Sequence, residues 1–301
     1  MSIEVKNVSK FYGEQAALNG VSFKINSGEI VGFLGPNGAG KSTMMKIITC
    51  FIGKSKGEVL VCGLDVESES LKVRAKVGYL PEHNPLYLDM YIKEYLDFVA
   101  GVYKIKNKKE RIAEMIALVG LEKEQNKKIG ALSKGYRQRV GLAQAMIHDP
   151  EVLILDEPTT GLDPNQLEEI RQLIVNIGKT KTVMLSTHIM QEVEAICDRV
   201  IIIKDGNIVA DDTTEHIQQG DTENLTVFVE FDNEISRNKL SQINGINSVK
   251  HLNNNQWLFE SNQKDVRTSI AKFAQQNNLL VLTMRIEEKS MEAVFKSLTK
   301  K

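Results

Sequence analysis

Hydrophobic residues in this chain occur partly as short continuous runs and partly at helical spacing. The apolar run from Gly28 to Leu34 ends in a glycine-rich turn, and helix-forming residues follow from Lys41 to Phe51. Residues 91–147 carry apolar side chains at the spacing of amphipathic helices. Continuous runs are typical of buried parallel strands, so their alternation with helices predicts an α/β fold. The later strands and helices are predicted at Val152–Leu155, Gln166–Ile177, Thr182–Ser186, Met190–Ile196 and Arg199–Lys204.

The end of the chain has a different pattern, in which strands and helices follow in the order βαββαβ before a last helix. This order is that of a ferredoxin-like α+β domain. All six prolines lie before residue 165, and the polar stretch at 218–224 is typical of a linker. We therefore expect two domains, 1–221 and 222–301. The elements predicted in the second are Leu225–Phe231, Glu234–Ile243, Ser248–Leu252, Trp257–Glu260, Asp265–Gln276, Leu279–Ile286 and Ser290–Leu298.

Composition describes a soluble globular protein of about two domains, with 301 residues, 42% hydrophobic and 26% charged. The net charge of −1 argues against a broad nucleic-acid surface, so no nucleic-acid partner is expected. Three scattered cysteines favour a reducing compartment. The chain has neither the run of about 20 apolar residues that a membrane span needs nor the core of a signal peptide. We expect a cytoplasmic chain that reaches a membrane only through a partner.

A glycine-rich loop provides the strongest chemical signal. Residues 35–42 fit G-x-x-x-x-G-K-[ST], in which backbone N–H groups wrap around phosphates and the helix beginning at Lys41 points its positive end at them. The Lys41 ammonium would lie against the β- and γ-phosphates, and the Ser42 hydroxyl would bind Mg²⁺. ATP and Mg²⁺ are therefore the expected ligands. The candidate nucleotide-binding residues here are Gly35, Pro36, Asn37, Gly38, Ala39, Gly40, Lys41, Ser42 and Thr43.

Two adjacent carboxylates follow the strand predicted at Val152–Leu155. Asp156 and Glu157 stand at its carboxyl end, which is where open α/β sheets bind their ligands. Asp156 can hold the metal ion, while Glu157 can accept a proton from the attacking water. Together with the glycine-rich loop, this pair predicts a nucleotide-hydrolysing site.

Between these elements, LSKGYRQR at Leu132–Arg139 resembles the signature of the ATP-binding cassette (ABC) ATPases, and the match runs from Ile3 to Thr214. The resemblance implies a P-loop cassette with a RecA-like core, an antiparallel β subdomain and a helical subdomain at about 83–147. It also implies that two cassettes pair head to tail. The N-terminus of the signature helix, which Ser133 can cap, would then face the nucleotide of the partner. The signature residues are Ser133, Lys134, Gly135 and Tyr136.

Other residues follow in the order of this family. By resemblance, Tyr12 stacks on adenine, and Asp163 ends the loop (the D-loop) that communicates across the dimer. His188 resembles the switch histidine, which touches the γ-phosphate and the attacking water. The catalytic residues that the resemblance implies are Glu157 and His188.

Three positions depart from the family pattern. The segment at 77–82 normally ends in a glutamine that contacts the metal and the membrane partner, but here it ends in Glu82. A carboxylate can still reach Mg²⁺, although it adds negative charge beside the triphosphate. Lys134 and Tyr136 replace the usual glycine and glutamine of the signature. Neither change removes the backbone N–H donors.

Three functions are compatible with these motifs. The first is the ATPase subunit of a membrane transporter, acting as a homodimer, or as a heterodimer with a second cassette, on a separate permease at the inner face of the membrane. The second is a soluble ABC ATPase acting on ribosomes or DNA, which usually has two cassettes or a long coiled-coil insert. Only about 50 residues separate Glu82 from Ser133 here. The third is a scaffold that binds nucleotide without hydrolysis, against which Glu157 and His188 argue.

We favour the transporter subunit. A single cassette followed by a small α+β tail looks like the drug, antibiotic or polymer exporters of this family. Over its whole length, the chain looks closest to the gliding-motility-associated transporter ATPases of Bacteroidetes-type bacteria. This last step depends on resemblance alone, because the chemistry of no residue indicates motility.

Overall fold

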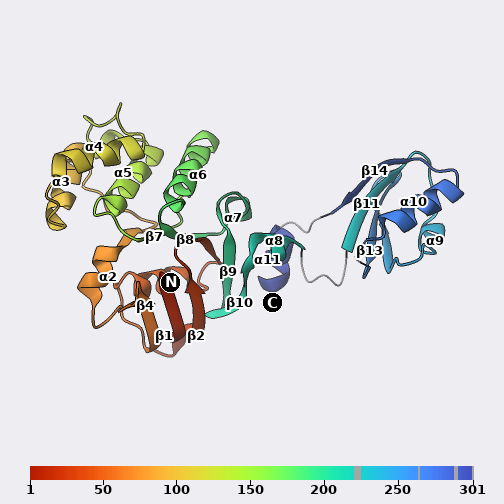
Figure 1. The fold of residues 1–301 in the computed structure, drawn as a ribbon, viewed down its shortest axis with the longest axis horizontal. Coiled ribbons are helices and arrows are strands. Elements are labelled where there is room, and N and C mark those ends of the chain that lie inside the picture. The colour runs from red at the N-terminus through yellow and green to blue at the C-terminus, as the bar shows by residue number, and fades with distance from the viewer. Residues whose placement is uncertain (220–224, 264, 288–290, 300–301) are drawn as a thin grey trace. The chain divides into compact units, whose positions relative to one another are not determined.

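The computed structural model describes residues 1–219, 225–263, 265–287 and 291–299 (Figure 1). The chain divides into two compact units, one of Met1–Thr214 with the end of the chain from Leu298, and one of Glu215–Ser297. The domain boundary predicted between residues 221 and 222 lies outside the described residues. In the described part of the chain, no helix has both the length and the apolar character of a membrane span.

A six-stranded sheet forms the centre of the first unit, in the order β10-β9-β3-β8-β7-β6. Strands β9 to β6 in this order run parallel, and β10 is antiparallel at the edge. Every residue of β3 and β7 is buried, which is why these strands appear in the sequence as continuous apolar runs. The predicted α/β pattern is confirmed. The strands are β3 Ile30–Leu34, β6 Val77–Leu80, β7 Val152–Asp156, β8 Thr182–Thr187, β9 Arg199–Lys204 and β10 Asn207–Thr213.

An antiparallel sheet in the order β2-β1-β4-β5 packs into the same core. Ile3 of β1 lies in one hydrophobic cluster with Phe33 and Ile201 of the central sheet. The pairing of β1 with β2 shifts register at several points, so buried and exposed positions do not alternate regularly along β1. Bounds for these strands were not predicted from the sequence. They are β1 Ile3–Tyr12, β2 Gln15–Ile25, β4 Lys56–Val61 and β5 Leu64–Asp65.

Helices α3, α4 and α5 lie together beside the central sheet (Figure 1). They confirm the helical pattern predicted over 91–147, with a short 3₁₀ turn between α4 and α5. The helix predicted over Lys41–Phe51 stops earlier, at Ile48, since Cys50 adopts a left-handed backbone with φ 59°. The helices of this unit are α1 Lys41–Ile48, α2 Ser70–Lys76, α3 Ile92–Val102, α4 Lys108–Leu118, η1 Ile129–Ala131, α5 Lys134–Met146, α6 Pro164–Gly178 and α7 Met190–Ile196.

The second unit has an antiparallel sheet in the order β12-β13-β11-β14 with its own core, which includes Phe231, Phe259 and Ile270. The helix predicted over Glu234–Ile243 is wrong in length, because the chain leaves the helix after Leu240 and continues in short turns. Ser290, at the start of the last predicted helix, lies outside the described residues. The elements that follow β10 along the chain are α8 Thr214–Gln219, β11 Leu225–Phe231, α9 Arg237–Leu240, β12 Ser248–His251, β13 Gln256–Ser261, α10 Arg267–Gln276, β14 Val281–Ile286 and α11 Met291–Thr299.

Candidate active site

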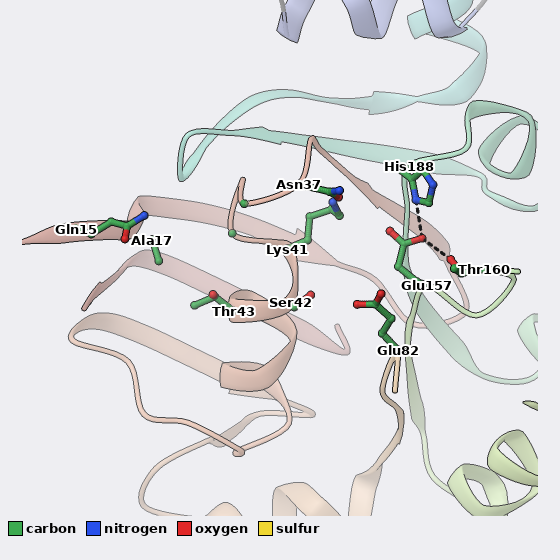
Figure 2. Close-up of a pocket in the computed structure, with 12 residues that line it drawn as sticks. Gln15, Ala17, Asn37, Lys41, Ser42, Thr43, Glu82, Glu157, Thr160 and His188 are labelled. Carbon is green, nitrogen blue, oxygen red and sulfur yellow. Dashed lines mark hydrogen bonds and ion pairs between the residues drawn. The ribbon is translucent and has the colours of Figure 1, made fainter. Parts of the chain in front are cut away.

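A cavity of about 400 Å³ lies at the carboxyl ends of β3, β7 and β8 (Figure 2). Parallel strands of an open sheet deliver their following loops to this edge, which is the usual ligand site of such folds. The lining combines the glycine-rich loop with residues from several other segments. They are Gln15, Ala17, Asn37, Gly38, Gly40, Lys41, Ser42, Thr43, Glu82, Glu157, Thr160 and His188.

The glycine-rich loop is shaped by close contacts with neighbouring strands. A Cβ atom added to Gly35 would overlap the carbonyl oxygen of Ile203, and one added to Gly40 would come within 2.6 Å of the carbonyl oxygen of Ala17. Gly40 also has φ 109°, a conformation that side chains other than glycine rarely adopt. Gly35, Pro36 and Ala39 belong to the loop but do not line the cavity.

Lys41 is held inside this loop by backbone carbonyl groups. Its Nζ donates to the carbonyl oxygens of Gly35 at 2.6 Å and Pro36 at 3.3 Å, and only 7% of the residue is exposed. Burial lowers the pKa of Lys41, and the nearby carboxylates, Glu157 first, act in the opposite direction. A cation with so little access to water is stabilised by a bound anion, so the loop is prepared for phosphate.

Asp156 joins the end of β7 to the glycine-rich loop. Its Oδ1 accepts hydrogen bonds from the Ser186 hydroxyl at 2.5 Å and the Ser42 hydroxyl at 3.4 Å. Figure 2 shows the carboxylate of Glu82 pointing toward Ser42. The described residues contain no group of three or more His, Cys, Asp or Glu side chains that could hold a metal ion. These oxygens nevertheless fit Mg²⁺, which is usually bound by one or two protein groups together with substrate phosphates and water.

Glu157 is the centre of a second cluster in the cavity. Its Oε2 lies 2.8 Å from Nδ1 of His188 and accepts from the hydroxyl of Thr160 at 3.1 Å (Figure 2). The Glu157 backbone has φ 51°, in the left-handed region, while its N–H donates to the hydroxyl of Ser186 at 3.0 Å. Such strain is retained where a side chain must be aimed in one direction. The side chain of Glu157 is 10% exposed, whereas that of His188 is 55% exposed.

The signature residues lie elsewhere in this chain and do not line the cavity. Ser133 is the N-cap of α5 and accepts from the N–H of Tyr136 at 3.4 Å. A Cβ atom on Gly161 would overlap Nζ of Lys134, and one on Gly135 would come within 2.5 Å of Oε1 of Gln166. The start of α5 therefore packs against the D-loop and the start of α6.

Asp163, at the end of the D-loop, caps the following helix. Its Oδ1 accepts from the N–H of Gln166 at 2.9 Å, and Pro164 occupies the first turn of α6. The D-loop thus contacts the cavity through Thr160 and Glu157, and the start of α5 through Gly161 and Lys134. Its last residue, Asp163, contacts α6.

Tyr12 stands beside the cavity without lining it. It is 53% exposed at the end of β1, and Nζ of Lys10 lies 5.2 Å from its ring centroid. Its partner across the hairpin is Gln15, which lines the cavity together with Ala17. Sequence reasoning missed both residues and the contact of Thr160, because their side chains belong to no phosphate or carboxylate motif.

Known proteins resemble this chain in sequence and in fold. The model of the family described as "ABC transporter" matches residues 18–160. The linearmycin resistance ATP-binding protein LnrL of Bacillus subtilis is 32% identical over 306 residues, which cover 99% of this chain and 98% of LnrL. A Nod factor export ATP-binding protein I of Burkholderia orbicola is 37% identical over 215 residues, covering 69% of this chain and 70% of that protein.

A solved structure shows the same fold. The ATP-binding cassette MJ0796, dimeric and bound to ADP and Pi in a post-hydrolysis state, has a TM-score of 0.64 and 30% identity to this chain. The match covers 70% of this chain and 98% of MJ0796. The cavity, its phosphate loop and its carboxylates are thus built on a cassette fold, and the chain belongs to the ABC transporter family as an ATP-binding subunit with ATPase activity.

Proposed function

We propose that this chain powers an ABC exporter as one of two cassettes that close head to tail on ATP and pass the motion to a separate permease. The observation that carries the proposal is the cluster of Glu157, His188 and Thr160 beside the phosphate loop. Export is supported by the name of the similar Nod factor export protein, and the resistance to linearmycin for which LnrL is named is compatible with it. The dimeric state of MJ0796 supports pairing.

Within one chain, each residue has a distinct role in this proposal. Lys41 binds the β- and γ-phosphates, and Ser42 and Asp156 would hold Mg²⁺, with Glu82 close to the same place. The metal ion supplies positive charge that offsets the charge of the phosphates. Glu157 accepts the proton of the attacking water, as a general base must.

Its two partners prepare Glu157 for this step. The hydroxyl of Thr160 and the imidazole Nδ1 of His188 both contact Oε2, while Oε1 has no hydrogen bond to the described residues and is directed into the cavity. A positioned carboxylate loses little entropy when it takes a proton. His188 is the more exposed member of the pair, as expected for a group that meets the γ-phosphate.

The residues outside the cavity would act on the second cassette. Ser133 and Lys134 are at the beginning of α5, where backbone N–H groups without intrahelical partners favour an anion. The D-loop lies against this helix start through Gly161, and Asp163 at its end caps α6. We propose that Ser133 to Tyr136 contact the nucleotide of the partner cassette and that Tyr12 stacks on adenine in its own.

For the end of the chain we propose an accessory ferredoxin-like domain over residues 222–301. The element order βαββαβ and the sheet order β12-β13-β11-β14 support it. LnrL matches over nearly the whole length of this chain, so this resistance protein includes a corresponding region. A link to gliding motility stays a prediction from sequence resemblance, since neither LnrL nor the Nod factor exporter is named for motility.

Purification from detergent-solubilised membranes tests the proposal. The tagged chain should co-purify with a membrane protein, whose identification by mass spectrometry would give the permease. Lys41→Ala leaves the surface of the helical subdomain unchanged. It therefore serves as a control that shows whether association with the permease requires bound nucleotide. Recovery with ribosomes or DNA, and with no membrane protein, would instead support the soluble ATPase.

A further inference from the structure

Glu192, on α7, is a buried carboxyl group outside the cavity. The residue is fully buried, with 0% exposure. Its Oε2 accepts a hydrogen bond from the hydroxyl of Thr187 at 2.6 Å, while its Oε1 has no hydrogen-bond partner among the residues that the structure describes. Burying a carboxyl group with one oxygen unsatisfied costs stability. Packing alone therefore does not explain why a carboxyl group is buried at this position.

The hydroxyl of Thr187 connects Glu192 to the backbone that follows. A hydroxyl has a single proton, and that of Thr187 points to Glu192. Its lone pairs face away from the carboxyl group, and one accepts the N–H of Ile189 at 3.1 Å. Glu192 thereby sets the direction of the hydroxyl and, through it, the position of the backbone on both sides of His188.

Ser186, the residue before Thr187, is also held by hydrogen bonds of its side chain. The Ser186 hydroxyl donates to Asp156 at 2.5 Å and accepts from the N–H of Glu157 at 3.0 Å. His188 itself is mostly in solvent, and within the described part of the chain its ring bonds to Glu157 at 2.8 Å. An exposed ring with so few contacts owes its position to its backbone, so the supports at Ser186 and Thr187 determine where the imidazole lies.

We propose that Glu192 is a positioning residue for hydrolysis, which acts through Thr187 to hold His188 against Glu157. The inference rests on the proposed function, because it assigns Glu192 to the same site. Misplacing a catalytic group by about 1 Å can cost roughly a hundredfold in rate. Binding of ATP depends on the phosphate loop instead, so turnover should change more than affinity.

Steady-state hydrolysis of radiolabelled ATP by the full-length chain tests the proposal. Glu192→Ala should lower kcat by about 10- to 100-fold with KM for ATP nearly unchanged. Glu192→Gln keeps an acceptor oxygen for Thr187 and should retain several times more activity than Glu192→Ala. Thr187→Val should be as slow as Glu192→Ala, whereas Thr187→Ser should recover turnover. Gln191→Ala, an exposed change on the same helix, is the matched control.

A double-mutant cycle separates positioning from a merely structural role. In a His188→Ala background, Glu192→Ala should cause less than about a twofold further loss, because coupled residues are not additive. An equal loss in both backgrounds, or equally slow Gln and Ala variants at position 192, would overturn the inference. If Glu192→Ala does not fold, Thr187→Val and Thr187→Ser decide between the two outcomes. If the wild-type chain hydrolyses ATP but the losses in the double-mutant cycle are additive, only this inference is refuted. If the wild-type chain has no ATPase activity, the proposed function and this inference are both refuted.

Discussion

At the residue scale, Glu157 shows how backbone and side chain cooperate. Its left-handed φ of 51° turns the chain sharply at the end of β7, and the N–H that this turn exposes is bound by Ser186. The carboxylate then meets His188 and Thr160 in the cavity. A pair of acidic residues after an apolar run indicated the chemistry, but nothing in that pattern indicated the turn or the contact with Thr160.

Replacing Glu157 with Gln tests the role of the general base. The amide has nearly the same shape and can still bond to His188 and Thr160, but it cannot take the proton of water. We expect ATP affinity to be kept and hydrolysis to slow by about 10²–10⁴-fold, the usual contribution of a general base. Single-turnover kinetics measure the rate, with the exposed change Glu58→Gln as the control. Turnover at the wild-type rate would refute the assignment.

Lys41→Ala should abolish nucleotide binding. The change removes the buried ammonium that the loop holds through Gly35 and Pro36, leaving those carbonyl oxygens without their donor and the phosphates without their cation. Isothermal titration calorimetry with ATP and Mg²⁺ measures the effect. Lys46→Ala, on the same helix, is the control and should bind ATP like the wild type. Equal affinity for both variants would contradict the phosphate-loop interpretation.

The surroundings of His148 predict that the stability of the folded protein depends on pH, independently of catalysis. Its ring stacks on Tyr103 at 3.9 Å, and Nε2 donates to the carbonyl oxygen of Val77 at 3.0 Å. Nδ1 is buried without a partner among the described residues, so a protonated ring would bury an N–H without an acceptor. Burial accordingly lowers the pKa of His148 below 6.5. Because the unfolded state binds the proton more tightly, stability falls as the pH drops from about 6.5 toward the folded pKa.

His148→Gln isolates this effect, since its amide can donate to Val77 and does not titrate. The free energy of unfolding, measured in urea at about pH 8 and about pH 5.5, should fall more for the wild type than for the variant. The same change for both proteins would show that another group causes the acid sensitivity.

At the element scale, the packing of α5 on β6 depends on the small size of Gly78. A Cβ atom there would overlap the carbonyl oxygen of Ala145 and come within 3.0 Å of the side chains of Leu153 and Pro150. Because this contact joins the backbone of β6 to the backbone of α5, a Cβ atom at Gly78 would fit only if the helix moved. Since α5 follows directly after Ser133, the same contact holds the signature residues at a constant place relative to the central sheet.

Gly78→Ala should therefore lower the free energy of unfolding by about 1–3 kcal/mol, the usual cost of overpacking a core. Urea denaturation of the full-length chain measures it. Gly53→Ala is the control, because a Cβ atom there meets only the end of the Glu67 side chain at 3.4 Å. Equal stability of the two variants would mean that α5 can move away from β6 at little cost.

The prediction of helices and strands from the sequence succeeded where the pattern of buried residues is regular. The strands β3 and β7 are buried on both faces and appear as apolar runs, and α7 and β9 have the predicted bounds. It gave no bounds for β1, whose register shifts disturb the alternation, and it overestimated the length of α9. The register shifts of β1 come from its pairing with β2, which local spacing along the chain does not contain.

At the scale of the whole molecule, each of the two units has a hydrophobic cluster of its own. One includes Phe33 in the nucleotide-binding unit, and the other includes Phe259 in the unit Glu215–Ser297. A chain with two compact units commonly departs from two-state unfolding. Because the phosphate loop and its carboxylates all belong to the first unit, ligand binding should stabilise that unit alone.

Differential scanning calorimetry should thus show two transitions. ATP with Mg²⁺, tested on Glu157→Gln to prevent turnover, should stabilise only one of them, by about 2.7 kcal/mol at a ligand concentration of roughly 100 times Kd. Phe259→Ala should destabilise only the other, by about 3–5 kcal/mol. One transition that responds to both changes would show that the two units unfold together.

The sequence by itself determined the chemistry of this protein, because a phosphate loop and a strand-end carboxylate pair need particular residues at short spacing. Lys41, Ser42, Asp156 and Glu157 were recognisable for that reason. Only the tertiary structure decided which residues meet across long separations, such as Ser42 with Asp156 and His188 with Glu157. It also decided that Glu192 is buried under Thr187, since burial depends on how α7 and β8 pack and leaves no local pattern.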